Sequence, residues 1–159
     1  MRITVLCVGK VKEKYYTDAI AEYAKRLGRY CRLEFIEVAD EKTPDGAPES
    51  VNRQIRRKEG QRLLEKTPDS AHVIALAIEG KQPDSLELSA KLARLANSGA
   101  SHIVFLIGGS LGLSEEVMER ADEAMSFSRL TFPHQLMRVI LLEQVYRAYR
   151  IMKNEPYHK

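Results

Sequence analysis

The sequence lacks several features that would assign it to a particular class of protein. It has no tryptophan, only two cysteines, and no apolar run long enough for a membrane-spanning helix or for the core of a signal peptide. Cys7 and Cys31 lie far apart in the chain, so we expect buried, reduced thiols. These absences lead us to expect a cytoplasmic protein.

Metal-binding and nucleophile patterns are also lacking. The histidines show no metal-ligand spacing with one another or with the cysteines, so we expect no metal site; they are His72, His102, His134 and His158. No Ser-His-Asp or Cys-His arrangement is apparent. The formal net charge of +3 is too small to indicate a nucleic-acid partner by itself.

What the chain does contain is the composition of an ordinary globular domain. Its 159 residues are 44% hydrophobic and 30% charged, and no repeat or second domain is visible, so we expect one domain over residues 1–159. Cations gather locally in three clusters: Lys10, Lys12 and Lys14; Lys25, Arg26, Arg29 and Arg32; Arg53, Arg56, Arg57 and Lys58. Each is most often a solvated face, but together they permit an RNA-binding surface without requiring one.

Short apolar runs alternate with amphipathic segments along the chain. Strands are expected at residues 2–9, 33–38, 72–78 and 102–107, and helices at residues 13–30, 51–66, 84–99 and briefly after Ser114. The strand at 2–9 is apolar on both faces. This alternation predicts an α/β fold, a mostly parallel sheet with helices on both faces.

The segment from Ser126 to Arg150 organises the C-terminal part. Proline geometry predicts an extended Phe132 and a helix that begins at Pro133 or His134. One uncharged stripe of this helix suits a core: Met137, Ile140, Leu141, Val145, Ala148, Ile151 and Met152. A second stripe consists of Val139, Leu142, Tyr146 and Tyr149. We expect a second subunit to cover it in a two-fold homodimer; a helix sandwiched within one domain is the alternative.

A glycine-rich turn follows the strand expected at 102–107. Gly108, Gly109 and Gly112 match neither G-x-G-x-x-G nor a Walker A loop, which disfavours a pyrophosphate cradle. Ligands of open α/β sheets bind outside the carboxyl ends of the strands. Together with the segment before Pro133, the turn predicts a weakly charged pocket suited to an uncharged nucleoside portion; a simple tight turn is the alternative.

Ordered motifs along the whole chain carry a family resemblance. They are V-G-K-V-K-E-K-Y from Val8, D-E-K-T-P-D from Asp40, F-L-I-G-G-S-L-G-L from Phe105, F-S-R-L-T-F-P-H-Q-L-M-R from Phe127, L-L-E-Q-V-Y-R-A-Y-R-I from Leu141 and E-P-Y-H-K from Glu155. With them the chain resembles the ribosomal RNA large subunit methyltransferase H family of the SPOUT class. The resemblance implies a homodimer with a deep trefoil knot in the C-terminal part of each chain, although knots are rare in proteins.

The resemblance also implies an activity and a cofactor site. The reaction is transfer of a methyl group from S-adenosylmethionine to N3 of a pseudouridine in 23S (large-subunit) ribosomal RNA, on the assembled ribosome. The implied cofactor contacts are Leu76, Gly108, Phe127, Ser128, Arg129, Leu130, Thr131 and Phe132. They fall where the residues alone predict a pocket. Ordinary core packing is the alternative for Leu76, Phe127, Leu130 and Phe132.

N3 must lose a proton, and three residues are candidates to assist. Tyr157 and His158 in the C-terminal tail are candidates for positioning the base or aiding proton loss, and Arg138 for holding an RNA phosphate or favouring the deprotonated base. A disordered tail is the alternative. Two other functions stay open: a non-enzymatic ribosome-binding or assembly factor, and a different nucleotide-dependent enzyme, such as a dehydrogenase on an ordinary doubly wound fold. The position of the glycine turn after the fourth strand, not the first, disfavours the dehydrogenase.

Overall fold

The computed structural model describes residues 1–159. Its strands are β1 (Arg2–Val8), β2 (Arg32–Val38), β3 (His72–Lys81), β4 (His102–Ile107) and β5 (Glu123–Met125), and its helices are α1 (Lys14–Leu27), α2 (Glu49–Glu65), α3 (Ser85–Asn97), α4 (Glu115–Arg120) and α5 (His134–Met152). The strands form one parallel sheet in the order β2-β1-β4-β3-β5. The predicted α/β fold is confirmed.

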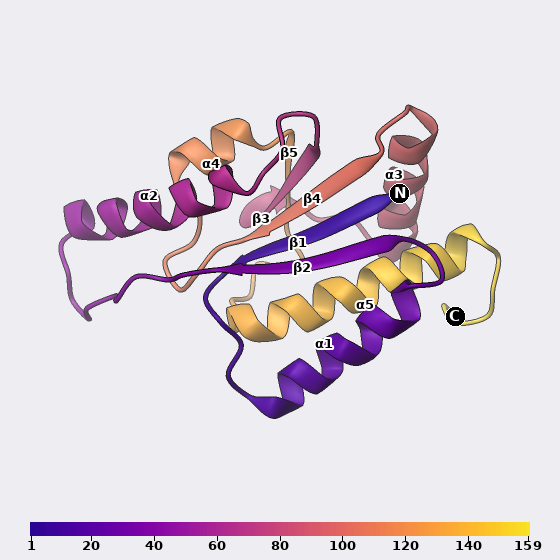
Figure 1. Ribbon diagram of the computed structural model, residues 1–159, viewed down its shortest axis with the longest axis horizontal. Coiled ribbons are helices and arrows are strands. Elements are labelled where there is room, and N and C mark those ends of the chain that lie inside the picture. The colour runs from indigo at the N-terminus through magenta and orange to yellow at the C-terminus, as the bar shows by residue number, and fades with distance from the viewer.

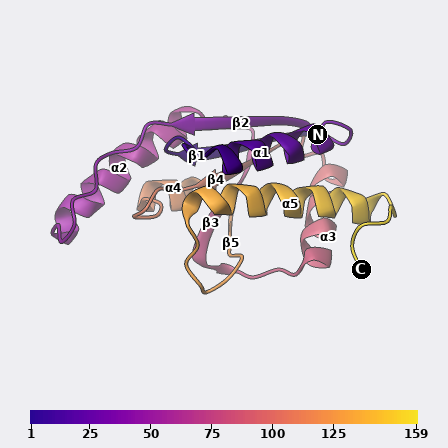
Figure 2. The ribbon, with the colours of Figure 1, turned by 90° about the horizontal axis from the view of Figure 1, so that it is seen from below.

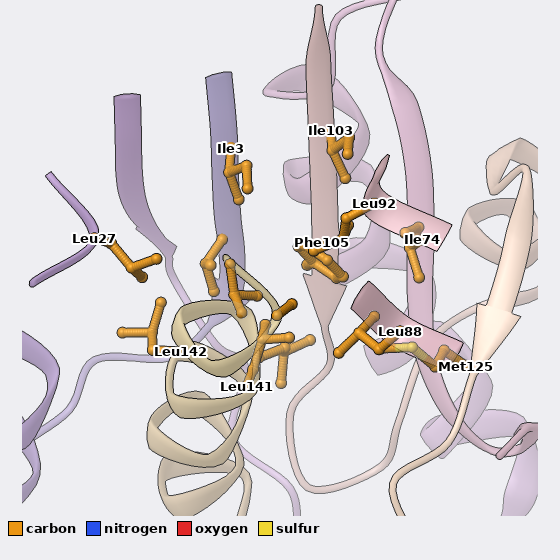
Figure 3. Close-up of a cluster of buried hydrophobic side chains, with 14 of the residues drawn as sticks. Ile3, Leu27, Ile74, Leu88, Leu92, Ile103, Phe105, Met125, Leu141 and Leu142 are labelled. Carbon is orange, nitrogen blue, oxygen red and sulfur yellow. The ribbon is translucent and has the colours of Figure 1, made fainter. Parts of the chain in front are cut away.

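Helices cover both faces of this sheet (Figure 1). The alternation along β1 shows how: Ile3, Val5 and Cys7 belong to the core beneath α1, α3 and α5, whereas Leu6 and Val8 belong to the core beneath α2 and α4. The prediction that β1 is buried on both faces is confirmed. Figure 3 shows the first of these cores, where α5 brings its leucines up to the apolar side chains of the strands.

Helix α5 begins as predicted, with Pro133 as its N-cap and His134 as its first residue. It packs between α1 and α3 in one layer (Figure 2). The prediction that Leu142 and Tyr149 need a second subunit to cover them is wrong, because they are 0% and 8% exposed within this chain. The sandwiched-helix alternative holds for both. The physical reason is that α1 and α3 cover the sides of α5 that the sheet leaves free.

Other local predictions can be checked against individual contacts. Asp84 accepts a hydrogen bond from the Glu87 backbone N–H at 2.8 Å, and Glu87 accepts one from the Asp84 N–H at 2.7 Å, which confirms the capping box before α3. Ser114 caps α4 by accepting from the Val117 N–H at 3.3 Å. Strand β5 has no counterpart among the sequence-based predictions, since three residues are too few to show a period.

Both cysteines are free thiols, as predicted. Burial raises the pKa of Cys7 to about 12, and burial raises the pKa of the half-buried Cys31 to about 11. Neither side chain is therefore a thiolate at neutral pH. Among the helices, none combines the length and the apolar character needed to cross a membrane.

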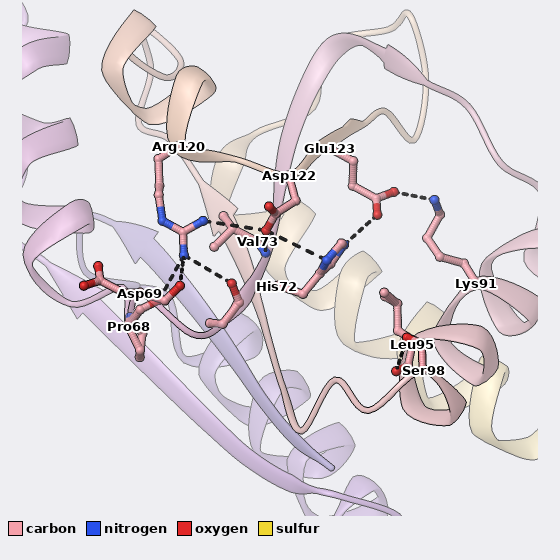
Figure 4. A network of polar contacts seen from close by, with 11 residues as sticks. Pro68, Asp69, His72, Val73, Lys91, Leu95, Ser98, Arg120, Asp122 and Glu123 are labelled. Carbon is pink, nitrogen blue, oxygen red and sulfur yellow. Dashed lines mark hydrogen bonds and ion pairs between the residues drawn. The ribbon is translucent and has the colours of Figure 1, made fainter.

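Charged side chains fasten the amino end of β3 and β5 (Figure 4). His72 Nε2 lies 2.7 Å from Glu123 Oε2, and Lys91 of α3 donates to the same carboxylate. Asp122 accepts from the Val73 N–H at 2.7 Å. These contacts hold the three-residue strand β5 against β3, so this end of the sheet is closed by polar groups that satisfy one another.

Candidate active site

A cavity of about 780 Å³ lies at the carboxyl ends of β3 and β4. Its walls come from three segments far apart in sequence, residues 76–79, 107–116 and 125–132, with additional residues from α2 and α5. The volume is that of a small-molecule site. Most of the predicted cofactor contacts line it: Leu76, Gly108, Phe127, Ser128, Leu130 and Phe132. Arg129 and Thr131 are exposed and are not among the lining residues.

The glycine turn is shaped by a close approach of its own backbone. A Cβ atom on Gly108 would lie 2.7 Å from the carbonyl carbon of Gly112, which is closer than real side chains come. Gly112 has a φ of +84°, in the region that favours glycine. The turn is therefore tight, as the alternative prediction had it, and it also forms a wall of the cavity. Because its three glycines carry no side chain, backbone groups at these positions lie next to whatever occupies the cavity.

Serine hydroxyls hold the loop between β5 and α5. Ser126 is buried; its hydroxyl donates to the Ser128 carbonyl at 2.9 Å and accepts from the Ser128 N–H at 3.3 Å. Ser128 Oγ accepts from the Leu130 N–H at 3.0 Å. The Ser126 N–H donates to the Lys81 carbonyl at 2.8 Å, which attaches the loop to the end of β3. These bonds fix the backbone of the third cavity wall.

Sequence reasoning missed several lining residues. Arg53, Arg56 and Arg57 of α2 reach the cavity, and so does His134 at the start of α5. The helical spacing of the three arginines was the available signal, but nothing in the sequence placed α2 beside the glycine turn. Burial, followed by the positive charge of Arg138, holds the pKa of His134 below its usual value. Its imidazole is therefore neutral at pH 7.

Arg138 lies behind the cavity wall, not in it. Its guanidinium is fully buried, donating from Nη1 to Glu37 at 2.9 Å and from Nη2 to the Val8 carbonyl at 2.7 Å. Glu37 also accepts from the Val11 N–H at 2.8 Å. Arg138 thus joins the ends of β1 and β2 to the first turns of α5. An RNA phosphate could reach it only if these partners were displaced, so the structure supports a positioning role.

The C-terminal tail is docked on the second half of α5. Tyr157 donates its hydroxyl proton to Glu143 at 3.0 Å, and the Arg147 guanidinium lies 4.7 Å from the centre of its ring. Arg147 Nη1 also lies 3.2 Å from His158 Nδ1. Burial, with the bond to Glu143, raises the pKa of Tyr157 to about 12, so this hydroxyl is a proton donor at neutral pH.

The tail and the cavity contact different parts of α5, and Figure 1 shows the C-terminus near the end of this helix and not near its start. The cavity is lined by His134 and Met137 in the first turn, whereas Tyr157 bonds to Glu143 in the middle of the helix and His158 lies beside Arg147. At roughly 1.5 Å per residue, Glu143 lies about 14 Å along the helix from His134, and neither tail residue lines the cavity. The structure therefore does not bring Tyr157 or His158 to the cavity of their own chain.

The parallel sheet and the three-segment cavity at its carboxyl edge define a class of enzyme that the comparisons identify. A family model described as "Predicted SPOUT methyltransferase" matches residues 1–158. A crystal structure of a protein assigned to a methylase family from Neisseria gonorrhoeae aligns with a TM-score of 0.54 at 14% identity, covering 99% of this chain and 85% of that one. A methylase-family protein from Haemophilus influenzae aligns with a TM-score of 0.51 at 10% identity, covering 96% and 66%. The chain is a SPOUT methyltransferase.

Close relatives define the family within this class. The chain is 62% identical to a protein from Bifidobacterium adolescentis, 57% to one from Exiguobacterium sibiricum and 58% to one from Clostridium perfringens, each over 159 residues and the full length of both chains. All three relatives are named ribosomal RNA large subunit methyltransferase H. The chain belongs to this family, as its motifs predict.

Proposed function

We propose that this protein transfers a methyl group from S-adenosylmethionine to N3 of a pseudouridine in 23S ribosomal RNA, on the assembled ribosome in the cytoplasm. The observation that carries the proposal is the cavity itself. It unites the three separate segments that contain Leu76, Gly108 and residues 127–132, which match the cofactor contacts implied by the family motifs. Membership of the family supports the RNA substrate, because the relatives' names refer to large-subunit ribosomal RNA.

The residues around the cavity fit S-adenosylmethionine. Leu76, Phe127 and Phe132 offer apolar surface for a flat base. A Cβ atom on Gly108 would clash with the backbone of the turn, so a glycine is needed at this position. When bound, the sulfonium supplies a methyl group that is already activated for transfer. The protein's own task is then to orient the acceptor nitrogen and to remove its proton.

His134 is a candidate proton acceptor inside the cavity. It lines the cavity wall, and its lowered pKa leaves the imidazole unprotonated at neutral pH. Tyr157 stays protonated, so it would position the base by donating a hydrogen bond in place of the one that it gives to Glu143. Arg138 would act indirectly, by fixing the first turns of α5, on which His134 lies. A methyl-transfer rate that keeps its pH profile in His134→Asn would exclude His134 as the acceptor.

A homodimer would bring the tail to the cavity. Apolar side chains remain exposed beside the cavity: Leu130 is 70% exposed and Ile78 is 49% exposed, and Ile140 of α5, predicted to face the core, is only half buried. Covering them with a second copy in a two-fold arrangement of antiparallel α5 helices would place the end of one helix near the start of the other. Tyr157 and His158 would then act in the partner's cavity. A monomer by sedimentation would exclude this arrangement.

The trefoil knot of the SPOUT class is also part of the proposal. The chain leaving β5 runs close against the end of β3: the Ser126 N–H bonds to the Lys81 carbonyl, and a Cβ on Gly80 would lie 2.7 Å from the Met125 nitrogen. Such backbone contact suits a segment threaded through a loop. An experimental structure tests this part of the proposal. If its chain path would become a straight line when the two ends are drawn apart, the chain contains no knot and the proposal is wrong.

The first test is transfer of labelled methyl from S-adenosylmethionine to assembled ribosomes and, in parallel, to protein-free ribosomal RNA, followed by nucleoside analysis. We expect N3-methylpseudouridine with ribosomes only. Label in another nucleoside would reassign the target. Neither transfer nor cofactor binding would favour a ribosome-binding or assembly factor.

Subunit complementation tests the shared site. Chains lacking residues 157–159 should bind S-adenosylmethionine but transfer no methyl group, whereas Gly108→Val chains should fail to bind it. If the tail acts in the partner's cavity, a refolded equal mixture of these two inactive chains recovers about a quarter of wild-type activity, because half of the dimers are mixed and each has one complete site. A mixture that stays inactive would place the tail and the cavity in the same chain.

A further inference from the structure

The segment that leads into α1 presents cations and an aromatic ring that the proposed chemistry does not use. Tyr15 is 67% exposed, and Lys10 and Lys12 are exposed with no hydrogen-bond or ion-pair partner in the chain. Lys14 differs, because Asp18 binds it at 2.7 Å. An exposed tyrosine alone is ordinary, but Tyr15 lies three and five residues from two free lysines in the sequence.

This segment emerges at the same edge of the sheet as the cavity. A Cβ on Gly109 of the glycine turn would touch Val8 at 3.2 Å, and a Cβ on Gly9 would lie 3.8 Å from Arg138 Nη2. The chain thus leaves β1 between the glycine turn and the start of α5. Figure 1 shows α1 and α5 beginning at the edge toward which the strands run.

The segment is also held in place. Val11 is buried between the two exposed lysines, and its N–H donates to Glu37 at 2.8 Å. Glu37 in turn binds Arg138. Lys10 and Lys12 are therefore carried by a backbone that is fixed before any ligand arrives, which reduces the entropy lost on binding.

Two of the arginines that line the cavity are neutralised by acids. Arg56 is paired with Glu49, and Arg57 with Glu116 at 3.0 Å. Glu13, the acid nearest to the lysines in sequence, is half buried and forms no ion pair with them. Arg53 of α2 and Arg129 in the loop before α5 are also exposed and form no ion pair, so Lys10 and Lys12 are part of a wider group of free cations around the cavity.

We propose that Lys10, Lys12 and Tyr15 form a binding surface for single-stranded ribosomal RNA beside the target nucleotide. The lysine ammonium groups contact backbone phosphates, and a base stacks on the exposed ring of Tyr15. The inference rests on the proposed function and assigns its RNA contact. The inference explains how a protein with a net charge of only +3 would bind RNA, because a small local surface supplies the positive charge.

The test compares variants of this surface with a matched control at the other end of α1. Tyr15→Ala should weaken binding to ribosomes about ten-fold and raise the KM for them similarly, as loss of a stacked base does. Tyr15→Phe should keep wild-type values, because it keeps the ring. The Lys10→Ala/Lys12→Ala variant should lower the slope of log affinity against log salt by about 1 to 2. Lys25→Ala, which alters another exposed lysine near the far end of α1, should change nothing.

Further measurements distinguish the loss of an RNA contact from a folding defect, from weaker cofactor binding and from the loss of a contact with a ribosomal protein. The thermal midpoint and the affinity for S-adenosylmethionine should be unchanged in every variant, since the altered side chains are exposed. Unchanged ribosome affinity and KM in Tyr15→Ala and in the lysine variant would overturn the inference while the proposed function stands. Weaker ribosome binding with an unchanged salt slope and unchanged binding to a 23S ribosomal RNA fragment would indicate a ribosomal protein as partner, and would also overturn it. Because binding is measured without methyl transfer, a wild-type protein that fails to methylate leaves this test readable.

Discussion

The two edges of the sheet use polar residues in opposite ways. At the amino edge the charged groups pair with one another: Glu123 holds both His72 and Lys91, and His102 Nε2 lies 2.8 Å from the Thr4 hydroxyl. At the carboxyl edge the strands end in glycines and serines around a cavity. Lys10 and Lys12 there are left without partners.

This difference separates stability from function. Polar groups that satisfy one another hold elements together and have nothing left to offer a ligand. Bare backbone, neutral imidazole and free ammonium groups contribute little to folding but are available for binding. Substitutions at the amino edge should therefore change the free energy of unfolding, and those at the carboxyl edge should change methyl transfer.

The largest expected effect is at Gly108. Gly108→Ala places a methyl group 2.7 Å from the Gly112 carbonyl carbon, so the turn must move. Because displacements of about 1 Å in a site cost roughly 100-fold in rate, we expect methyl transfer to fall about that much. Steady-state transfer assays and calorimetric titration of S-adenosylmethionine measure it.

Gly28→Ala is the matched control for that change. Gly28 ends α1 with ordinary helical geometry, a φ of −57°, and a Cβ there would lie 3.3 Å from the Lys25 carbonyl oxygen. Its activity should equal that of the wild type. If Gly108→Ala also retains activity, the glycine turn is only a connection and not a cavity wall that matters for catalysis.

Arg138 is an exception to this division, because its buried guanidinium forms an ion pair with Glu37 at the carboxyl edge. Arg138→Met leaves Glu37 without its cation and the Val8 carbonyl without its donor, and should cost about 3 kcal/mol of unfolding free energy, the lower end for buried pairs since Glu37 is 30% exposed. Methyl transfer should fall as well. Urea unfolding measures the stability change.

A double-mutant cycle isolates this ion pair. In Glu37→Gln/Arg138→Met the orphaned carboxylate is gone, so the double variant should lose less stability than the sum of the single variants. Additive losses would mean that the two side chains act independently, and would remove the link between the strand ends and α5.

The sequence was most informative where a pattern repeats or a residue type dictates geometry. The apolar strands, Pro133 at the start of α5 and the capping box at Asp84 were all predictable. The faces of α5 were not, because its period shows which residues are apolar but not that α1 and α3 share its layer. For a similar reason, the sequence did not predict that the arginines of α2 line the cavity. The placement of a helix over a sheet depends on tertiary packing. The cavity segments themselves came from the glycine turn and from the family motifs.

At the amino edge, Glu123→Ala should lower the unfolding free energy by about 1 to 2 kcal/mol, the range for losing hydrogen bonds to a charged, partly exposed group. Methyl transfer should be unchanged. Glu119→Ala, an exposed acid on nearby α4 without a partner, should stay within about 0.5 kcal/mol of wild type. Loss of activity in a well-folded Glu123→Ala protein would contradict the division between the edges.

Acid titration sharpens the Glu123 prediction. Burial alone would raise the pKa of Glu123, but the hydrogen bonds from Lys91 and His72 outweigh burial and lower it. The unfolded chain therefore binds a proton at higher pH than the native chain does. The stabilisation is present above the ordinary pKa of glutamate and is lost as pH falls through the native value, so the difference between wild type and Glu123→Ala should shrink in acid.

The smallest expected effect is a change in the pH dependence of stability, tested at one histidine from each edge. Burial, followed by the charge of Arg2, lowers the pKa of His102, and burial, followed by the charge of Arg138, lowers that of His134. Nearby Glu34 and Asp40 oppose these shifts without reversing them. The unfolded chain then binds more protons below about pH 6.5, so stability should decrease as pH falls through that value. Thermal midpoints between pH 8 and 5 should fall less steeply in His102→Gln and His134→Gln than in wild type. Only His134→Gln should also alter the pH profile of methyl transfer, and an altered profile in His102→Gln would show that the two edges are coupled.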